Sequence, residues 1–210
     1  MDHPRSEIIL ASRKGVERVM NILFVCTGNT CRSPMAEALL RKLAKDANLD
    51  IEVRSAGVAA SHGASISGNA VAALQDHQID AVGASSTPLT GREVEWADLI
   101  LTMTSGHKQH VVQQFPSSIE HIYTLKEYVE MDEQVIRDMI TLEERIADWQ
   151  MKHALGEPIP DSDRAAIIAL QQRIPNFDIR DPYGGSLVEY RHCLAEIHSA
   201  LLKLLKRTQG

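Results

Sequence analysis

The stretch Val25-Cys26-Thr27-Gly28-Asn29-Thr30-Cys31-Arg32-Ser33-Pro34 decides the fold of this 210-residue chain. A short apolar run, residues 22–25, leads into it, and an amphipathic helical pattern follows it. We expect Ser33 to cap this helix and Pro34 to take its first position, where the missing N–H of proline costs nothing. The stretch is therefore predicted to be a loop that joins a buried strand to a helix N-terminus.

Such a loop is suited to bind a phosphate group. Backbone N–H groups and the positive end of the helix dipole converge on it, and Arg32 can hold two phosphate oxygens at once. The same field favours the thiolate form of Cys26, which is the form that attacks phosphorus. A Walker-type nucleotide loop is the structural alternative, but no Gly-Lys-Ser/Thr follows Gly28. We therefore predict a phosphate-binding catalytic loop.

The composition is that of an ordinary globular protein. The chain is 44% hydrophobic and 24% charged, and its length fits one domain with room for an added subdomain. The net charge of −6 argues against nucleic acid as a partner, and no apolar stretch is long enough to span a membrane. Three cysteines, two of them in the loop, do not form a disulfide framework. Because a thiolate nucleophile is hard to keep reduced outside the cytosol, we predict a cytoplasmic protein.

Residues 1–19 stand apart from the rest of the chain. They hold four basic residues around an apolar run that is too short for the core of a signal peptide. We interpret them as a disordered tail or as the product of an upstream start codon, and neither interpretation gives them a function. The folded domain is expected to span residues 20–210.

Strand and helix patterns alternate along most of the sequence. Apolar runs predict four strands, at residues 22–25, 51–55, 96–102 and 119–125. Helical patterns follow the loop and recur at residues 69–77, 105–114 and 187–205. This alternation predicts an α/β fold, a doubly wound four-stranded parallel sheet with helices on both faces. Ligands of such folds bind at the carboxyl ends of the strands, which is where the cysteine loop falls.

Residues 130–176 break this alternation, because they contain no strand pattern. A helix with one apolar seam and a shorter helix at residues 163–173 flank a turn. We interpret the segment as a helical hairpin inserted into the α/β domain. It holds ten acidic and five basic residues, and thus five of the six net negative charges. It is either a surface hairpin that only packs, or a lid or docking arm that attracts basic segments of a partner.

A phosphate transfer through a cysteine also needs an acid that protonates the leaving group, and the loop offers none. Directly after the insertion lies the turn-rich segment Asp178-Ile179-Arg180-Asp181-Pro182-Tyr183-Gly184-Gly185-Ser186. Asp181 precedes a proline, which holds it in an extended conformation. Many Asp-Pro pairs are simply turns, so spacing alone leaves Asp181 either a turn residue or the acid.

Three motifs carry a resemblance to a known family. They are the cysteine loop at residues 26–34, Arg54-Ser55-Ala56-Gly57-Val58 and Asp181-Pro182-Tyr183-Gly184-Gly185-Ser186. They resemble the low-molecular-weight phosphotyrosine phosphatases, and within that family they most resemble the bacterial protein-arginine phosphatases. The resemblance covers residues 21–129 and 177–206, about two thirds of the chain. The insertion and the N-terminal residues lie outside it.

The resemblance implies a role for each motif residue. Cys26 would be the nucleophile, Arg32 the phosphate clamp, and Asp181 the general acid that then activates water as a base. Asn29, Ser33 and Ser55 would brace the loop through side-chain hydrogen bonds. The substrate would be bound by the loop and an aromatic wall, at Thr27, Gly28, Asn29, Thr30, Cys31, Ser33 and Tyr183. No metal or other cofactor is implied, because the loop amides and Arg32 supply the positive field.

Three positions bear on how this chain differs within the family. Ala84 stands where a histidine often joins the bracing network, and Ala59 stands where the arginine phosphatases have an aromatic wall residue. At Thr30 the tyrosine-directed members usually have a bulky aliphatic residue, which packs against a flat ring. A smaller, polar threonine suits the guanidinium of phosphoarginine. We therefore predict a phosphatase for phosphoarginine in proteins, with phosphotyrosine as the alternative substrate and loop packing as the alternative role of Thr30.

Other functions fit the sequence less well. An arsenate reductase of this fold needs a downstream pair of relay cysteines, and only Cys193, an expected core residue, is present. A phosphopeptide-binding module without turnover would lack the nucleophile or the acid. His107 and His110 lie one helical turn apart, but without a third ligand we expect no metal site and assign them to a surface helix. Cys31 lies five residues after Cys26, and we predict that mild oxidant joins the two thiols and silences the enzyme reversibly.

Overall fold

The computed structural model describes residues 19–208 of the chain. Within them, residues 19–129 and 177–208 form one compact unit, and residues 130–176 form a second. The interpretation of residues 1–18 lies outside the described part of the chain. Val19, which closes the predicted tail, is exposed.

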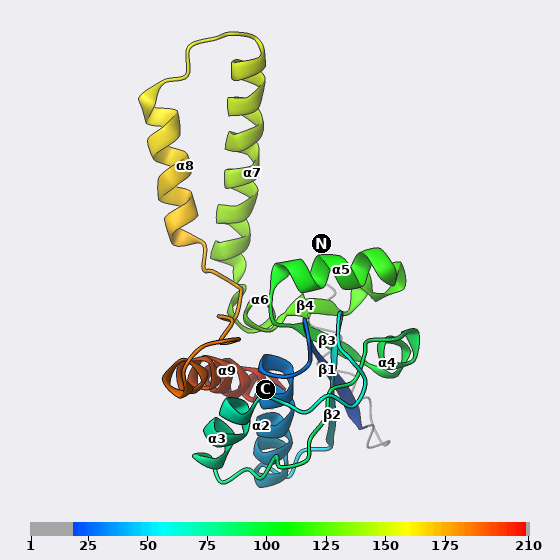
Figure 1. The fold of residues 1–210 in the computed structure, drawn as a ribbon. Helices are drawn as coiled ribbons and strands as arrows, with labels where there is room; N and C mark the ends of the chain where they lie inside the picture. Colours follow the sequence, from blue (N-terminus) through cyan, green and yellow to red (C-terminus); the bar gives the residue numbers. More distant parts are fainter. Residues whose placement is uncertain (1–18, 209–210) are drawn as a thin grey trace. The chain divides into compact units, whose positions relative to one another are not determined.

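A four-stranded parallel sheet forms the centre of the larger unit (Figure 1). Its strands are β1 (Met20–Cys26), β2 (Ile51–Gly57), β3 (Leu99–Thr102) and β4 (Ile122–Thr124), in the order β2-β1-β3-β4. β1 lies between β2 and β3, and its residues 22–25 are completely buried. The chain therefore runs outward from β1 in both directions, which confirms the predicted doubly wound α/β fold.

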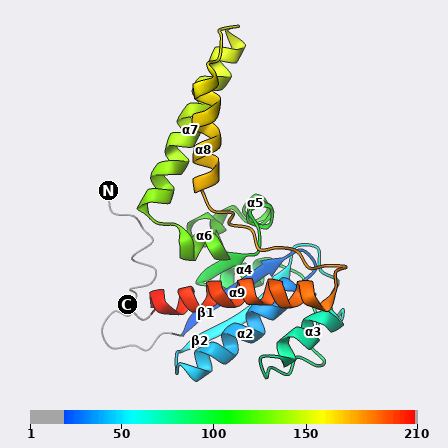
Figure 2. The ribbon, with the colours of Figure 1, turned by 90° about the vertical axis from the view of Figure 1, so that its left-hand side faces the viewer.

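Helices cover both faces of this sheet (Figures 1 and 2). One face is covered by α2 (Arg32–Asp46), α3 (Gly68–Gln75) and α9 (Leu187–Thr208). The other face is covered by α4 (Gly91–Trp96) and α5 (Ser105–Gln114). Each large apolar side chain that these helices bury contributes about 1.5–3 kcal/mol to stability, so the two layers hold the sheet rigid.

Several element boundaries differ from the predicted ones, because local capping outweighs the apolar pattern. Thr90 and Glu93 form a capping box that starts α4, so Trp96 ends a helix and β3 begins only after it. The run predicted as a strand at residues 119–125 is shared by a 3-10 helix, η1 (Pro116–Glu120), by β4 and by α6 (Leu125–Glu130).

The smaller unit is a hairpin of α7 (Glu133–Ala154) and α8 (Asp161–Arg173), the inserted hairpin of the predicted fold. The predicted apolar seam is the half-buried side of α7, at Val135, Met139, Leu142, Ile146 and Trp149. Buried Asp138 on α7 forms an ion pair with Arg173 on α8, which joins the two helices. None of the described helices has the length and apolar character needed to cross a membrane.

Candidate active site

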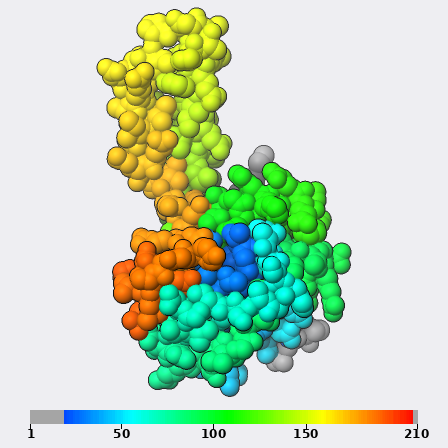
Figure 3. Space-filling model, in the orientation of Figure 1, coloured from blue at the N-terminus to red at the C-terminus, as the bar shows by residue number. Residues whose placement is uncertain are grey.

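The cysteine loop lies at the carboxyl end of the sheet, between β1 and α2. Cys26 is the last residue of β1 and is paired in register with Gly57, the last residue of β2. In Figure 3 the blue residues of this part of the chain reach the surface between the orange segment that precedes α9 and the cyan segment that follows β2. The loop therefore lies at the surface, among segments that are distant from it in sequence.

The hydroxyl of Ser33 binds the cysteine sulfur and does not cap α2, contrary to prediction. α2 begins at Arg32 with Cys31 as its N-cap, which puts Ser33 in the first turn and Pro34 at the third position. The Ser33 hydroxyl donates to Sγ of Cys26 at 3.0 Å, and the backbone N–H of Asn29 donates to the same sulfur at 3.3 Å. Both donors stabilise negative charge on this buried sulfur.

Asn29 holds the loop in shape. Its backbone is left-handed, with φ 52°, a conformation that asparagine adopts more readily than most residues. Its side-chain nitrogen donates to the hydroxyls of Ser33 at 2.9 Å and Ser55 at 2.7 Å. Its side-chain oxygen accepts the backbone N–H of Thr87 at 2.7 Å. The structure thus brings the three expected bracing residues into one network, and it adds Thr87, which the sequence did not single out.

The bracing network continues to a half-buried carboxylate, that of Glu37. The Ser55 hydroxyl donates to Oε2 of Glu37 at 2.5 Å, and Arg41 forms an ion pair with Glu37 at 2.7 Å. Burial raises the pKa of Glu37 above its usual value. Ala84, where the resemblance led us to expect a histidine in many relatives, is exposed. The contacts that support the loop here come from the Thr87 backbone and from Glu37.

Gly57 lets the end of β2 approach the loop closely. A Cβ atom on this glycine would lie 2.6 Å from the carbonyl oxygen of Thr27 and 2.8 Å from the backbone nitrogen of Asn29. The Gly57 N–H donates to the carbonyl of Thr87 at 2.9 Å, which ties the strand end in place. A side chain at this position would therefore push the loop out of shape. The signal in the sequence was a glycine that ends a strand beside the loop.

Asp181 reaches the loop from a distant part of the chain. The Nη2 atom of Arg32 donates to Oδ2 of Asp181 at 2.6 Å. The Arg32 side chain is 5% exposed, whereas that of Asp181 is 51% exposed. The Nε atom of Arg32 is buried and has no hydrogen-bond partner among residues 19–208. A buried N–H without a partner is unfavourable, and an oxygen of a bound phosphate would satisfy it.

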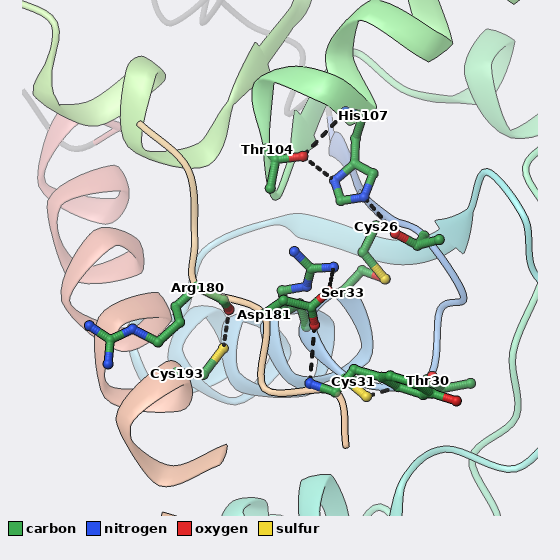
Figure 4. Close-up of polar contacts among 12 residues, drawn as sticks. Cys26, Thr30, Cys31, Ser33, Thr104, His107, Arg180, Asp181 and Cys193 are labelled. Carbon is green, nitrogen blue, oxygen red and sulfur yellow. Dashed lines mark hydrogen bonds and ion pairs between the residues drawn. The ribbon is translucent and has the colours of Figure 1, made fainter. Parts of the chain in front are cut away.

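Three hydrogen bonds fix the segment that leads to Asp181. The backbone N–H of Ile179 donates to the carbonyl oxygen of Met103, the residue directly after β3, at 2.8 Å. The N–H of Arg180 donates to Glu196 at 3.3 Å, and its carbonyl accepts the thiol of Cys193, also at 3.3 Å (Figure 4). Cys193 is buried on α9, as expected, and burial raises its pKa to about 12, so it stays a neutral thiol.

His107 belongs to the site, and its assignment to a surface helix was wrong. Its Nε2 lies 2.8 Å from Oγ1 of Thr27, and its Nδ1 lies 2.8 Å from Oγ1 of Thr104 (Figure 4). Burial, followed by the charge of Arg32, lowers the pKa of His107 to about 4. His110, one turn later, is exposed as expected. Sequence reasoning missed His107 because its contact with Thr27 spans 80 residues.

Thr30 and Cys31 lie within the loop, with Cys31 buried against Tyr190 of α9, whereas Tyr183 lies exposed beside Asp181. Oγ1 of Thr30 lies 3.6 Å from Sγ of Cys31, and that sulfur lies 3.1 Å from the hydroxyl of Tyr190. Burial and the contact with Cys31 raise the pKa of Tyr190 to about 12. Tyr183 is 79% exposed, and its backbone N–H donates to Oδ1 of Asp181 at 3.2 Å.

The positive field of the site comes from Arg32 and the loop amides. In the described part of the chain, no three His, Cys, Asp or Glu side chains gather into a group that could hold a metal ion. The arrangement offers a buried sulfur with two hydrogen-bond donors, a guanidinium with a free N–H and a carboxylate beside it. Chemically, this suits transfer of a phosphoryl group to sulfur.

Comparisons with known proteins show which family this chain resembles. The profile of the low molecular weight phosphotyrosine protein phosphatases matches residues 21–144. The protein-arginine-phosphatase of Bacillus subtilis (strain 168) is 51% identical over 110 residues, which cover 52% of this chain and 73% of that protein. The low molecular weight protein-tyrosine-phosphatase PtpB of Staphylococcus aureus is 30% identical over 185 residues, 88% of this chain and 96% of that protein. The crystal structure of a YwlE mutant from Bacillus subtilis superimposes with a TM-score of 0.68 at 34% identity, covering 91% of this chain and 99% of that one.

The fold, the cysteine loop and the similarity to these phosphatases place the chain in the class of protein phosphatases, which are hydrolases. The chain belongs to the low molecular weight phosphotyrosine protein phosphatase family. The family expected from the three sequence motifs is thereby confirmed.

Proposed function

We propose that this chain removes phosphate from phosphoarginine side chains of proteins, with Cys26 as nucleophile, Arg32 as phosphate clamp and Asp181 as general acid. The observation that carries the proposal is the surroundings of Cys26. Its sulfur accepts two hydrogen bonds inside a loop whose arginine contacts Asp181. Nucleophile, anion site and proton donor thus belong to one constellation.

In the first step the Cys26 thiolate attacks phosphorus, so that an S–P bond forms while the P–N bond to the guanidine breaks. Asp181, protonated, gives its proton to the departing nitrogen. Arg32 holds two oxygens of the transferred group through Nε and Nη2, and its contact with Asp181 is exchanged for one with phosphate. The loop N–H groups and the N-terminus of α2 stabilise the remaining charge.

In the second step water attacks the phosphorus of the cysteinyl phosphate. Asp181, now a carboxylate, accepts a proton from this water, the S–P bond breaks and inorganic phosphate leaves. The hydroxyl of Ser33 stabilises the departing thiolate, since it donates to this sulfur at 3.0 Å. Asn29 and Ser55 keep the donors directed inward through the bracing network.

Three observations support phosphoarginine as the substrate. Thr30 is a small, half-buried residue with a hydroxyl. The side chain of Asp181 is half-exposed, so the oxygen that does not carry the proton can accept an N–H of a guanidinium. The Bacillus subtilis relative that is 51% identical is named a protein-arginine-phosphatase. Phosphotyrosine is the second candidate, because the relative that matches 88% of this chain is named a protein-tyrosine-phosphatase.

Kinetics on two matched peptides test the substrate, one with phosphoarginine and one with phosphotyrosine at the same position. We expect a higher kcat/KM for phosphoarginine, and we expect Thr30→Ile to move the preference toward phosphotyrosine by about tenfold. Thr141→Ile makes the same change on α7 and serves as the matched control. A higher kcat/KM for phosphotyrosine in the natural chain would refute the substrate, and full activity of Cys26→Ser would refute the chemistry.

We further propose that the hairpin of α7 and α8 is a docking arm for basic segments around a phosphorylated arginine. Its acidic excess supports this, because long-range attraction raises the encounter rate with cationic partners. The same acidity makes nucleic acid an unsuitable partner. Since Cys26 must stay reduced to act, we place the enzyme in the cytoplasm.

A further inference from the structure

The side chain of His107 has no part in the chemistry proposed above, yet it is 8% exposed and hydrogen-bonded to the cysteine loop. We propose that His107 is a positioning residue, which orients the Thr27 hydroxyl so that its proton points to a phosphate oxygen of the substrate. This inference rests on the proposed function. It adds one side-chain donor to the backbone donors of the loop.

A continuous chain of hydrogen bonds carries the inference. Oγ1 of Thr104, the N-cap of α5, accepts the backbone N–H of His107 at 3.3 Å and lies 2.8 Å from Nδ1 of its ring. The other ring nitrogen, Nε2, lies 2.8 Å from Oγ1 of Thr27. The imidazole thus links the buried start of α5 to the exposed residue that directly follows Cys26.

The direction of the protons follows from the charge state of the ring. Burial lowers the pKa of His107 to about 4, so at pH 7 the imidazole is neutral, with one N–H and one acceptor nitrogen. The backbone N–H already uses one lone pair of the Thr104 oxygen, and the Thr104 hydroxyl can give its own proton to Nδ1. Nε2 then carries the ring proton and donates it to Thr27. The Thr27 hydroxyl keeps its proton for another acceptor.

The opposite tautomer would work against the substrate. It would take the proton of the Thr27 hydroxyl and turn the oxygen lone pairs of Thr27 toward the phosphoryl group. The oxygens of that group are acceptors, so lone pairs would face lone pairs. Phosphate binding therefore selects the tautomer with the proton on Nε2. Burial has the largest effect on the pKa of the ring, and the charges of Arg32 and His110 lower that pKa further. Asp181 and Asp178 act in the opposite direction, but burial outweighs them and keeps the ring neutral.

Inhibition by inorganic phosphate tests this arrangement, measured as a competitive Ki against hydrolysis of an aryl phosphate at pH 7. We expect Thr27→Val and His107→Leu each to raise Ki about three- to tenfold. The double variant should raise it no further than either single variant. His107→Gln, which keeps an N–H at the place of Nε2, should restore most of the affinity. The exposed His110→Ala, one turn along α5, is the control.

The proposal would be overturned if the increases in Ki of the two single variants multiplied in the double variant. It would also be overturned if Ki were unchanged in His107→Leu. A merely structural role would lower the melting temperature of the His107 variants without coupling them to Thr27. If His107→Leu does not fold, Thr27→Ser and Thr27→Val still test whether the hydroxyl at residue 27 donates to phosphate. Only the serine keeps this donor, so an equal Ki in the two variants would overturn the proposal. Inorganic phosphate is the product from either peptide substrate, so rejection of phosphoarginine in the peptide assay would leave this test intact.

Discussion

Gly57→Ala adds a single methyl group beside the loop and substitutes none of the proposed catalytic residues. The new Cβ would lie 2.6 Å from the Thr27 carbonyl oxygen, about 0.8 Å short of the 3.4 Å at which ordinary contact begins. It would also lie 2.8 Å from the backbone nitrogen of Asn29. Both neighbours are backbone atoms, so neither can rotate away. Because the N–H of Gly57 is tied to Thr87, the loop must give way as well as the strand.

A displacement of this size in a catalytic loop should lower kcat by about 10- to 100-fold, which is about 1.4–2.7 kcal/mol of activation free energy. Overpacking should also lower the free energy of unfolding by about 1–3 kcal/mol. Hydrolysis of p-nitrophenyl phosphate and thermal unfolding measure the two effects. Gly68→Ala is the matched control, because a Cβ at the start of α3 meets no atom within 4 Å. A folded Gly57→Ala variant with unchanged kcat would refute the reasoning that this close approach shapes the loop.

Oxidation, pH and salt probe other parts of the molecule. Cys31→Ser should recover less activity than the natural chain when reductant follows peroxide, since Cys26 then lacks a thiol partner; equal recovery would refute the protective disulfide. Burial lowers the pKa of His107 to about 4, below the usual 6.5, so its contribution to stability is present above pH 6.5 and lost as the pH falls toward 4. This loss should reach about 1 kcal/mol by pH 5, after allowance for solvent screening, and denaturant titrations of His107→Gln should show a flatter pH dependence. Glu143 and Glu144 are both exposed on α7, and replacing both with Gln should raise KM for basic phosphopeptides at low salt. KM for an aryl phosphate should not change. The same KM for basic phosphopeptides in the variant and the natural chain would exclude the docking arm.

The strand, loop and helix around Cys26 could be predicted because their signals are local. An apolar run, a glycine-containing loop and a helical pattern lie within a few residues of one another, and the parallel sheet then follows from the alternation of elements. The prediction that Ser33 caps the helix was wrong because the helix begins one residue before it and its hydroxyl donates to the sulfur of Cys26. This partner comes within reach only when the loop folds back. The contact of His107 with Thr27 depends on tertiary structure, and no pattern in the sequence indicated it. For Gly57 the sequence offered only a glycine at the end of a strand, and the backbone atoms that it approaches are known only from the folded chain.

Residues 130–176 separate the larger unit into two parts of the sequence, yet the carboxylate of Asp181, which follows this insertion, contacts Arg32. Hydrogen bonds of Ile179 and Arg180 hold the segment that leads to Asp181 in place, because their partners belong to the larger unit, one directly after β3 and two on α9. Ordering of the hairpin is therefore not needed to position the carboxylate. The entropy of closing a loop grows only slowly with its length, so residues 130–176 cost the site little. The fold can thus carry a large acidic hairpin next in sequence to the proposed acid, and Asp181 still reaches Arg32.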